Sequence, residues 1–492
     1  MRHRARTGRG RSSRLDRPAP DRPAGQLLTA IVWFRRDLRL HDHPALRAAL
    51  DSSERVVPVF CLDDRLLRGR HASGPRTQFL LESLQDLDDA LRSRGSGLVI
   101  RRGRPERELA VLADRVGADE LHLSADVSGF DRKRLRRVAA AVGHSGVEIH
   151  AHPGVGAIDD LGALRTRAGK PYTVFSPFHR AWLDEPRRPV LAAPRRLAAL
   201  PSRLPKGRIP PLRAVGLEQE VLEPPSGGER EGRARLSRFI SSGLDRYADR
   251  QDALGVDGTS RLSPYLHLGC VSAREVEDRL GRGEGASAFR RQLCWRDFLH
   301  QVLLHFPRNA RSEFRPRYRG RIRWSRSRRA FEAWCEGRTG YPLVDAGMRQ
   351  LRREGWMHNR ARLVVGSFLT KDLGIDWRWG ERHFMRLLVD GDEANNNGNW
   401  QWIASVGTDP QPVFRRILSP TRQMEAHDPD GVYVRRYVPE LAGVPDDYLS
   451  EPWTMPEEMQ RQTGCMIGSD YPAPIVDHAE ARRAALERYR VA

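Results

Sequence analysis

The sequence predicts a chain in two parts: an α/β domain with a Rossmann-like parallel sheet over residues 29–155, and an all-α domain over residues 229–492. Before residue 155, short apolar runs of strand type alternate with helical patterns, as in parallel strands joined by right-handed crossovers. After residue 229 the strand patterns vanish and apolar residues recur at helical spacing. A length of 492 residues allows two or three domains with a sizeable core.

The first strand is predicted as a buried apolar run, TAIVWF. The five predicted strands of the sheet are 29–34, 55–60, 98–101, 120–124 and 147–150. A helix is predicted over 76–92, with Pro75 near its start and Gly95 past its end. Its apolar face is Phe79, Leu80, Leu84, Leu87 and Leu91. No GxGxxG motif follows the first strand, so no dinucleotide site is predicted there.

Two segments are predicted to lie outside the domains. Residues 156–228 contain proline-rich patches and are interpreted as an interdomain linker, apart from an ordered insert at 170–178 (KPYTVFSPF). Residues 1–28 are rich in Arg, Pro, Gly and Ser, a composition that predicts a disordered basic tail.

The all-α domain contains a stretch, residues 341–412, that is rich in uncommon residues. Helices are predicted at 343–354, at 360–372 ending before Gly374, and at 381–389. The polar run 390–399 that follows has amides and carboxylates that can bond the edges of a heteroaromatic ring, and the tryptophans around it can stack on its faces. This stretch therefore predicts a helical pocket for a large planar ligand.

Charge and cysteine usage narrow the function classes. A formal net charge of +21 favours nucleic acid as the partner, the alternative being a solvated basic surface in an arginine-rich composition. The five cysteines are scattered and form no CxxC pair, which predicts a reduced cytoplasmic protein without structural zinc, an iron–sulfur cluster or disulfides. No metal site, membrane span or signal peptide is predicted.

Long ordered stretches carry a resemblance to a known family. TGYPLVDAGMRQLRREGWMHNRARL, SFLTKDLGIDWRWGERHF and LVDGDEANNNGNWQWIASVGTD resemble the flavin-binding domain of the DNA photolyase and cryptochrome family, most closely bacterial class I photolyases that act on cyclobutane pyrimidine dimers. FRRDLRLHDHPAL, after the first strand, resembles the opening of the family's antenna-type domain. The resemblance covers about residues 29–485.

The resemblance implies a site for FAD, reduced and anionic in the active form. The residues implied for the pyrophosphate are Tyr247, Thr259, Ser260, Arg261, Leu262 and Ser263. Those implied around the isoalloxazine are Arg296, Arg362, Asp390, Gly391, Asp392 and Asn396, with Arg362 paired to Asp390 and Asn396 facing flavin N5. Taken alone, TSRLS would be an ordinary helix cap and the two aspartates a solvated turn.

The family's electron-transfer tryptophans correspond to Trp400, Trp377 and Trp324, from the flavin outward. Its lesion pocket corresponds to walls at Trp295 and Trp402 with contacts from Gln292, Asn359 and Leu363. Each tryptophan, read alone, could equally be core packing. The arginine-rich loop 311–323 is interpreted as a phosphate-binding surface or, alternatively, as a solvated loop.

Three positions depart from the pattern of the dimer photolyases. Gln292 stands in place of Glu, Leu363 in place of Met and Gln251 in place of Arg, which leaves lesion specificity open. Gln292 keeps hydrogen-bonding capacity but lacks a negative charge. Asn359 stands where the (6-4) photolyases have His, which disfavours that activity.

The resemblance implies a monomeric enzyme that binds UV-damaged DNA, in which light-excited reduced FAD donates an electron to a flipped-out dimer. The alternatives are a cryptochrome-like blue-light photoreceptor, a photolyase acting on another lesion such as the (6-4) photoproduct, and a basic flavoprotein without catalysis. Folate-binding members carry an Asn-Glu pair where this chain has residues 125–130 (ADVSGF). A deazaflavin antenna, or none, is therefore predicted over folate.

Overall fold

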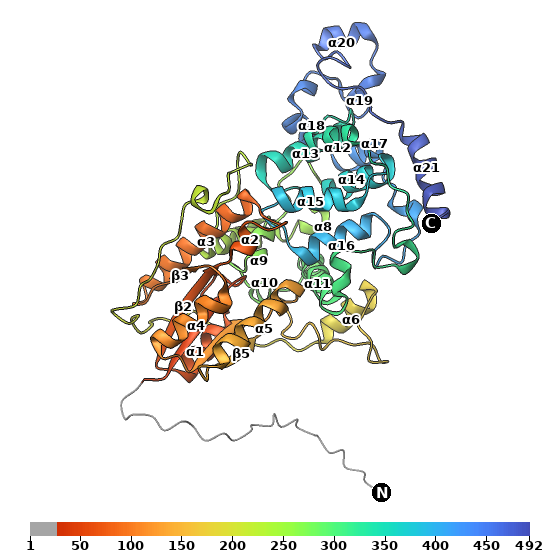
Figure 1. Ribbon diagram of the computed structural model, residues 1–492. Coiled ribbons are helices and arrows are strands. Elements are labelled where there is room, and N and C mark those ends of the chain that lie inside the picture. Colours follow the sequence, from red (N-terminus) through yellow and green to blue (C-terminus); the bar gives the residue numbers. More distant parts are fainter. Residues whose placement is uncertain (1–26) are drawn as a thin grey trace.

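The structure, a computed structural model, describes residues 27–492, so nearly all of the tail predicted at 1–28 lies outside the described residues. The sheet and its covering helices form one lobe, and the helices after residue 229 form a second, larger lobe beside it (Figure 1). The predicted fold class is therefore confirmed. Within the described residues, no helix is both long enough and apolar enough to span a membrane.

The sheet has five parallel strands in the order β3-β2-β1-β4-β5. They are β1 (Thr29–Phe34), β2 (Arg55–Leu62), β3 (Val99–Arg102), β4 (Glu120–Ser124) and β5 (Glu148–His152). Each begins within one residue of its predicted start. From β1 the chain first adds β2 and β3 on one side of the sheet and then adds β4 and β5 on the other side. In parallel sheets a ligand-binding crevice is typical at such a switch point, beyond the carboxyl ends of the two central strands.

The two faces of the sheet are covered by different helices. The helices of this lobe are α1 (Pro44–Ser52), α2 (Asp64–Leu67), α3 (Gly74–Arg92), α4 (Pro105–Val116) and α5 (Gly129–Gly143). Ile31 and Trp33 of β1 pack in one apolar cluster with α4 and α5, whereas Ala30 and Val32 pack in another with α1 and α3. This is the two-residue alternation of a strand buried on both faces.

The connection between the lobes is mostly irregular but contains α6 (Phe175–Asp184). Phe178 and Trp182 on this helix are fully buried, and the Trp182 indole donates to Asp297 at 3.0 Å. The segment that the sequence indicated only as an ordered insert therefore leads into a helix that packs on the second lobe.

The second lobe is helical throughout its described length apart from short turns and isolated bridges. Its helices are α7 (Glu229–Arg238), α8 (Tyr247–Arg250), α9 (Ser263–His267), α10 (Ala273–Arg279), α11 (Glu284–His305), α12 (Arg328–Glu336), α13 (Pro342–Glu354), α14 (Asn359–Ser367), α15 (Trp377–Leu387), α16 (Glu393–Ile403), α17 (Pro420–His427), α18 (Val432–Tyr437), α19 (Asp446–Leu449), α20 (Glu457–Thr463) and α21 (His478–Arg490). A π-helical turn extends α14 to Asp372, and Gly374 follows with a φ of +63°. Glycine adopts that left-handed conformation without strain.

The polar run 390–399 was not predicted to be helical, but most of it forms the first part of α16. Asp392 caps the helix by accepting from the backbone N–H of Asn395 at 2.8 Å. The side chain of Gln401 is fully buried and donates to the carbonyls of Asn309 and Ser312, which joins α16 to the loop after α11. Asparagine is a weak helix former, so these tertiary contacts override local preference.

Candidate cofactor and lesion site

An ion pair lies where α15 turns into α16. Arg362 on α14 donates to both carboxylate oxygens of Asp390, at 3.2 and 2.8 Å, and its Nε donates to the Met357 carbonyl. The Asp390 side chain is buried, whereas that of Arg362 is 25% exposed. Two parallel bonds hold the guanidinium plane in one orientation, so this pair presents a fixed polar edge. The contact predicted between the two residues is confirmed.

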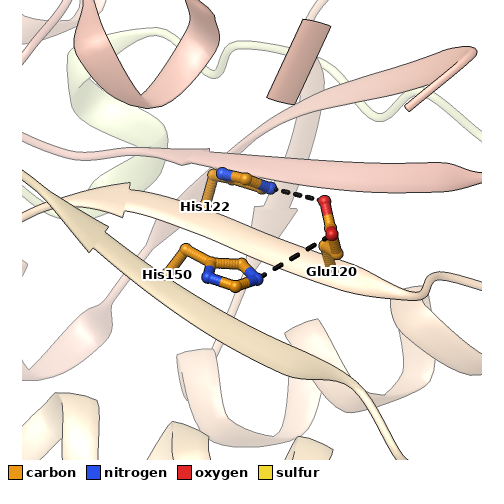
Figure 2. A group of neighbouring side chains, drawn as sticks. All are labelled: Glu120, His122 and His150. Atoms are coloured by element: carbon orange, nitrogen blue, oxygen red, sulfur yellow. Dashed lines mark hydrogen bonds and ion pairs between the residues drawn. The ribbon is translucent and has the colours of Figure 1, made fainter. Parts of the chain in front are cut away.

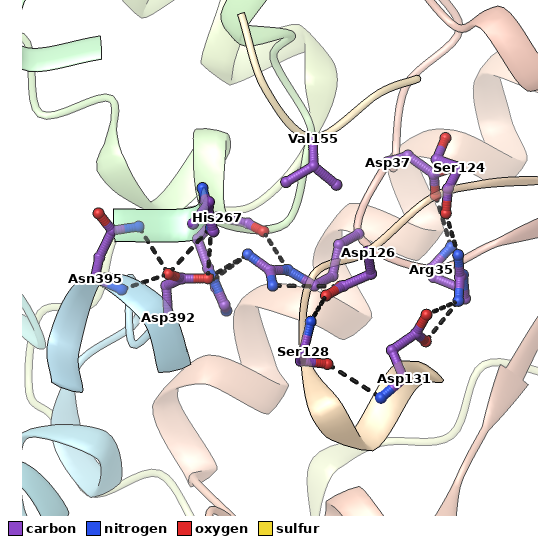
Figure 3. A network of polar contacts seen from close by, with 12 residues as sticks. Arg35, Asp37, Ser124, Asp126, Ser128, Asp131, Val155, His267, Asp392 and Asn395 are labelled. Atoms are coloured by element: carbon purple, nitrogen blue, oxygen red, sulfur yellow. Dashed lines mark hydrogen bonds and ion pairs between the residues drawn. The ribbon is translucent and has the colours of Figure 1, made fainter. Parts of the chain in front are cut away.

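Asp392 joins the two lobes (Figure 3). Its carboxylate accepts from Arg36, which follows β1, and lies 3.3 Å from His300 on α11. Burial would raise the pKa of Asp392, but the charge of Arg36 and contact with His300 hold it well below its usual value. Arg36 also lies 3.4 Å from Asp126 after β4. Asp392 was predicted beside the isoalloxazine; the structure shows its oxygens bound by protein groups that fix the start of α16.

Asn396, one turn into α16, has a defined amide orientation. Its nitrogen donates to the backbone carbonyl of Glu381 at 3.0 Å and lies 3.4 Å from the Glu381 carboxylate. A carbonyl only accepts, so the nitrogen must face Glu381 and the amide oxygen remains for another partner. That oxygen suits an N–H donor such as N5 of a reduced flavin.

The turn predicted to hold the pyrophosphate precedes α9. Arg261 has a φ of +49°, which is uncommon for a residue with a side chain and marks a sharp turn. Its guanidinium lies 4.5 Å from the centre of the Trp356 ring and pairs with Glu354 at 2.9 Å. A cleft beside this turn is lined by residues that include Thr259, Arg261, Trp356 and His358. Ser260 and Leu262 are buried within the turn, and Ser263 accepts a bond from the Trp356 indole at 3.2 Å.

Tyr247, the other residue predicted for the pyrophosphate, opens α8. Its ring is buried edge-on against Phe239 and Phe289, with centroid distances of 5.6 and 5.1 Å. Burial raises the pKa of Tyr247 well above its usual value, so its hydroxyl stays a neutral donor.

The charges near Asp390 fit an anionic cofactor. Arg76 on α3 donates to the carbonyls of Met385 and Leu388, at 2.8 and 3.2 Å, and no carboxylate among the described residues forms an ion pair with it. Burial lowers its pKa to about 10. A Cβ at Gly391 would lie 2.4 Å from the Arg76 guanidinium, so the Arg76 side chain packs directly against this glycine. Arg296 also bonds two carbonyls, those of Val155 and Leu266. Arg296 also lies 3.5 Å from Asp297, whereas negative charge on a ligand would offset the charge of Arg76.

The three tryptophans predicted for electron transfer belong to one apolar cluster. Trp400 and Trp377 are buried, whereas Trp324 is half-buried at the cluster's edge. Trp400 packs so closely on α15 that a Cβ at Gly380 would lie 2.1 Å from its ring. Ser325, next to Trp324, donates its backbone N–H to Gly374 at 2.7 Å, close to the start of α15. Trp324 is thus the most exposed of the three.

Each tryptophan predicted for the lesion pocket has a face covered by protein. Trp295 stacks on Phe175 of α6, with centroids 3.6 Å apart and planes at 2°. The guanidinium of Arg416 lies 3.4 Å above the Trp402 ring and bonds Asp409. An indole packed against protein on one face is held in a fixed orientation. Sequence reasoning missed both supports, although Phe175 lies in the ordered insert.

The remaining predicted contacts differ in exposure. Gln292, three residues before Trp295 on α11, is exposed and lies 3.4 Å from Gln251, so two departures from the photolyase pattern meet each other. Asn359 is exposed at the start of α14. Leu363 is half-buried and packs against the apolar cluster.

Comparisons with known proteins give one family for both lobes. Residues 30–197 match the family model described as DNA photolyase, and residues 289–491 match the FAD binding domain of DNA photolyase. A deoxyribodipyrimidine photo-lyase of Streptomyces griseus is 44% identical over 466 residues, covering 94% of this chain and 99% of that protein.

Solved structures agree over nearly the whole chain. A bacterial class III photolyase from Agrobacterium tumefaciens has a TM-score of 0.88 at 34% identity and covers 96% of this chain and 99% of its own. A Synechocystis cryptochrome has a TM-score of 0.85 at 30% identity, with coverages of 94% and 99%. A photolyase from Sulfolobus tokodaii, solved with two FAD molecules, has a TM-score of 0.82 at 32% identity, with coverages of 94% and 100%.

Proposed function

Since the chain belongs to the DNA photolyase and cryptochrome family, we propose that it is a deoxyribodipyrimidine photo-lyase that repairs cyclobutane pyrimidine dimers under light. The observation that carries the proposal is the ion pair between Arg362 and Asp390, together with the oriented amide of Asn396. The ion pair can face a charged ring, and the free amide oxygen of Asn396 suits the reduced state that donates electrons.

FAD, when bound, supplies the light-driven electron, and this chain's residues bind and orient it. Tyr247 and the turn from Thr259 to Ser263 would hold the phosphates. Arg362, Asp390 and Asn396 would bind the ring, and the charge of Arg76 would favour its anionic form. Asp392 acts through α16, because its own oxygens are bound by Arg36 and by histidines.

A dimer within a duplex must leave the base stack before it can meet the cofactor. Trp295 and Trp402, each supported on one face, stack on the two rings of the flipped dimer. Asn359 and Gln292 are exposed, so their amides can bond the pyrimidine edges. Leu363 adds apolar contact.

The proposal is tested with an oligonucleotide that contains one defined cyclobutane thymine dimer. Chemically reduced protein is incubated with it in blue light or in the dark, and chromatography follows the restoration of intact thymines. Restoration only in light is the expected result. If FAD is bound and reduced but nothing is restored, the proposal is wrong, and an oligonucleotide with a (6-4) photoproduct is tested next.

A second candidate function is blue-light photoreception, because a cryptochrome is also similar over nearly the whole chain. A photoreceptor would bind FAD and photoreduce it yet leave the dimer intact. The light-dependent assay therefore separates the two functions.

The tryptophan series Trp400, Trp377 and Trp324 is proposed to carry electrons inward when oxidised FAD is photoreduced. Trp324→Phe is expected to slow photoreduction by about tenfold or more, since phenylalanine is harder to oxidise and each 1.4 kcal/mol added to a barrier costs a factor of ten. Repair by protein reduced beforehand should be unchanged.

Trp379→Phe is the matched control, because Trp379 is half-buried in the same cluster and outside the series. Absorbance during illumination measures the rate of photoreduction. A loss of repair by pre-reduced Trp324→Phe protein would contradict the assignment.

The loop 311–323 is proposed to contact DNA phosphates. Arg321 and Arg323 are exposed and form no ion pair within residues 27–492. Replacing both with Gln is expected to reduce the slope of log affinity against log salt by about 0.9 for each phosphate that the loop no longer neutralises. Arg338→Gln is the control, because Arg338 is exposed but pairs with Glu336. An unchanged slope for the double variant would show that the loop is only solvated.

For the second chromophore we propose a deazaflavin, or none, over folate. The segment after β4 contains Asp126, whose carboxylate faces Arg36 and accepts from Ser128, so it is not free for a pterin. Extraction of a folate from the purified protein would refute this.

The class within the family and the cellular setting are also proposals. The sequence motifs resemble class I photolyases most, whereas the structural comparison finds a class III photolyase that is similar over 96% of this chain. We propose domains at 29–155 and 229–492 with a linker at 156–228, and a cytoplasmic monomer. Sedimentation of the purified protein tests the oligomeric state.

A further inference from the structure

The outer edge of the sheet carries a polar cluster far from the residues assigned to the cofactor. In the parallel register of β4 and β5, Glu120 lies beside Glu148 and His122 beside His150. Alternate residues of a strand share a face. These four side chains therefore lie on the α1 side of the sheet, where β1 presents Ala30 and Val32.

Three of these residues converge on one point (Figure 2). Nε2 of His122 lies 2.9 Å from one oxygen of Glu120, and Nε2 of His150 lies 3.9 Å from the other. One ligand atom from each residue falls within 4.8 Å of the others. A tetrahedral ion with bonds of about 2.1 Å needs ligand atoms about 3.4 Å apart, so small side-chain movements would suffice.

Neighbouring groups hold these side chains in orientations suited to a metal ion. Nδ1 of His122 lies 3.0 Å from Nε2 of His152, which faces it across the two strands. Ser52, the last residue of α1, donates to Glu120 at 2.5 Å. Metal-ligating histidines and carboxylates usually have such partners, which fix their orientation.

One ligand atom, Nε2 of His150, makes only long contacts with carboxylates, at 3.7 Å from Glu148 and 3.9 Å from Glu120. Nε2 of His150 is buried and forms no hydrogen bond with any described residue. A buried imidazole nitrogen that makes no hydrogen bond and has two carboxylates nearby is available as a metal ligand.

We propose that Glu120, His122 and His150 form a binding site for a divalent transition metal ion, with Zn²⁺ as the first choice and His152 as a positioning residue. Two imidazoles with one carboxylate suit zinc and its neighbours, whereas Ca²⁺ and Mg²⁺ prefer oxygen ligands. The side chains of Glu120 and His150 are 25% and 31% exposed, so an ion and a bound water can enter. The ion would join β5, which is paired on one side only, to β4 and to the end of α1.

When the ion binds, His122 must present Nε2 with its lone pair. Its proton then lies on Nδ1 and is donated to Nε2 of His152, which carries its own proton on Nδ1. Without the ion, Nε2–H of His152 donates to His122, and Nε2–H of His122 donates to Glu120. Both imidazoles stay neutral in the two states, so this pair releases no proton.

The test uses the full-length protein with its FAD and without a purification tag. After EDTA treatment and desalting, the protein is titrated with Zn²⁺ by calorimetry, and bound zinc is counted by mass spectrometry. Co²⁺ is the spectroscopic probe, through its visible absorption. The expected results are one Zn²⁺ per chain, a melting temperature raised by zinc, and intense Co²⁺ bands typical of four-coordination.

His150→Ala is expected to lower zinc affinity by more than a hundredfold. His152→Ala should lower it by about 10- to 100-fold, as for other residues that orient a ligand, and His152→Gln should restore part of it, because its amide oxygen accepts from Nδ1–H of His122. His144→Ala is the matched control, an exposed histidine just before β5, and should bind zinc normally.

FAD content and melting without zinc show whether each variant is folded. If His150→Ala is unfolded, Glu120→Gln replaces it, because the amide still accepts from Ser52 but is a weak metal ligand. The proposal is overturned if the wild-type protein binds no stoichiometric zinc. It is equally overturned if His150→Ala, or Glu120→Gln in its place, binds zinc as tightly as His144→Ala.

Discussion

Trp295→Ala is expected to weaken binding of a duplex that contains a pyrimidine dimer by about 5- to 150-fold, because stacking on an aromatic side chain contributes about 1–3 kcal/mol per base. Trp295 stacks on Phe175 at 3.6 Å, so its indole is already oriented before DNA arrives. The preorganised ring loses little entropy on binding. Fluorescence anisotropy in the dark, with FAD reduced, measures the affinity.

The same variant should bind an undamaged duplex with unchanged affinity, since phosphate contacts supply most non-specific binding. Phe175→Leu is an informative companion. It leaves Trp295 in place but removes its stacking partner, so we expect a smaller loss that is again confined to damaged DNA. Equal losses on damaged and undamaged duplexes would show that Trp295 supports the fold and does not contact the lesion.

Asp390→Asn is expected to reduce FAD affinity by about 5- to 10-fold. The Asp390 side chain is buried, and loss of its charge leaves the Arg362 guanidinium without its carboxylate partner. Removing one partner of such a bond costs about 1–3 kcal/mol, and the low end applies here because Arg362 is partly exposed. The ratio of flavin to protein absorbance after gel filtration, followed by titration with FAD, measures the loss.

Glu223→Gln is the matched control for Asp390→Asn. Glu223 also forms a bidentate pair with an arginine, Arg353, but both side chains are exposed. An exposed pair contributes about 0–1 kcal/mol, so FAD binding should be unchanged. If Asp390→Asn binds FAD as tightly as Glu223→Gln, the ion pair with Arg362 has no part in the cofactor site.

Much of this architecture follows from local patterns in the chain. The buried strand 29–34 and the helix at 74–92 were predicted within two residues, because a two-residue or a 3.6-residue apolar repeat is a property of a single segment. The family resemblance likewise predicted the contact between Arg362 and Asp390. Ordered motifs of this length carry such pairings even though the partners come from different helices.

Other features depend on segments that meet only in the folded chain. The run that includes Asn396 became a helix through tertiary contacts, against weak local propensity. Arg36 reaches Asp392 across the lobes, and Phe175, from a segment interpreted as linker, supports Trp295.

The cluster of Glu120, His122 and His150 likewise could not be predicted from the sequence. Its members alternate along two separate strands, and no short motif links them. They converge because the parallel register places one strand's residues beside the other's. Periodicity within a segment is thus readable from the amino acids, whereas the partners of each buried charge and ring depend on packing between distant segments.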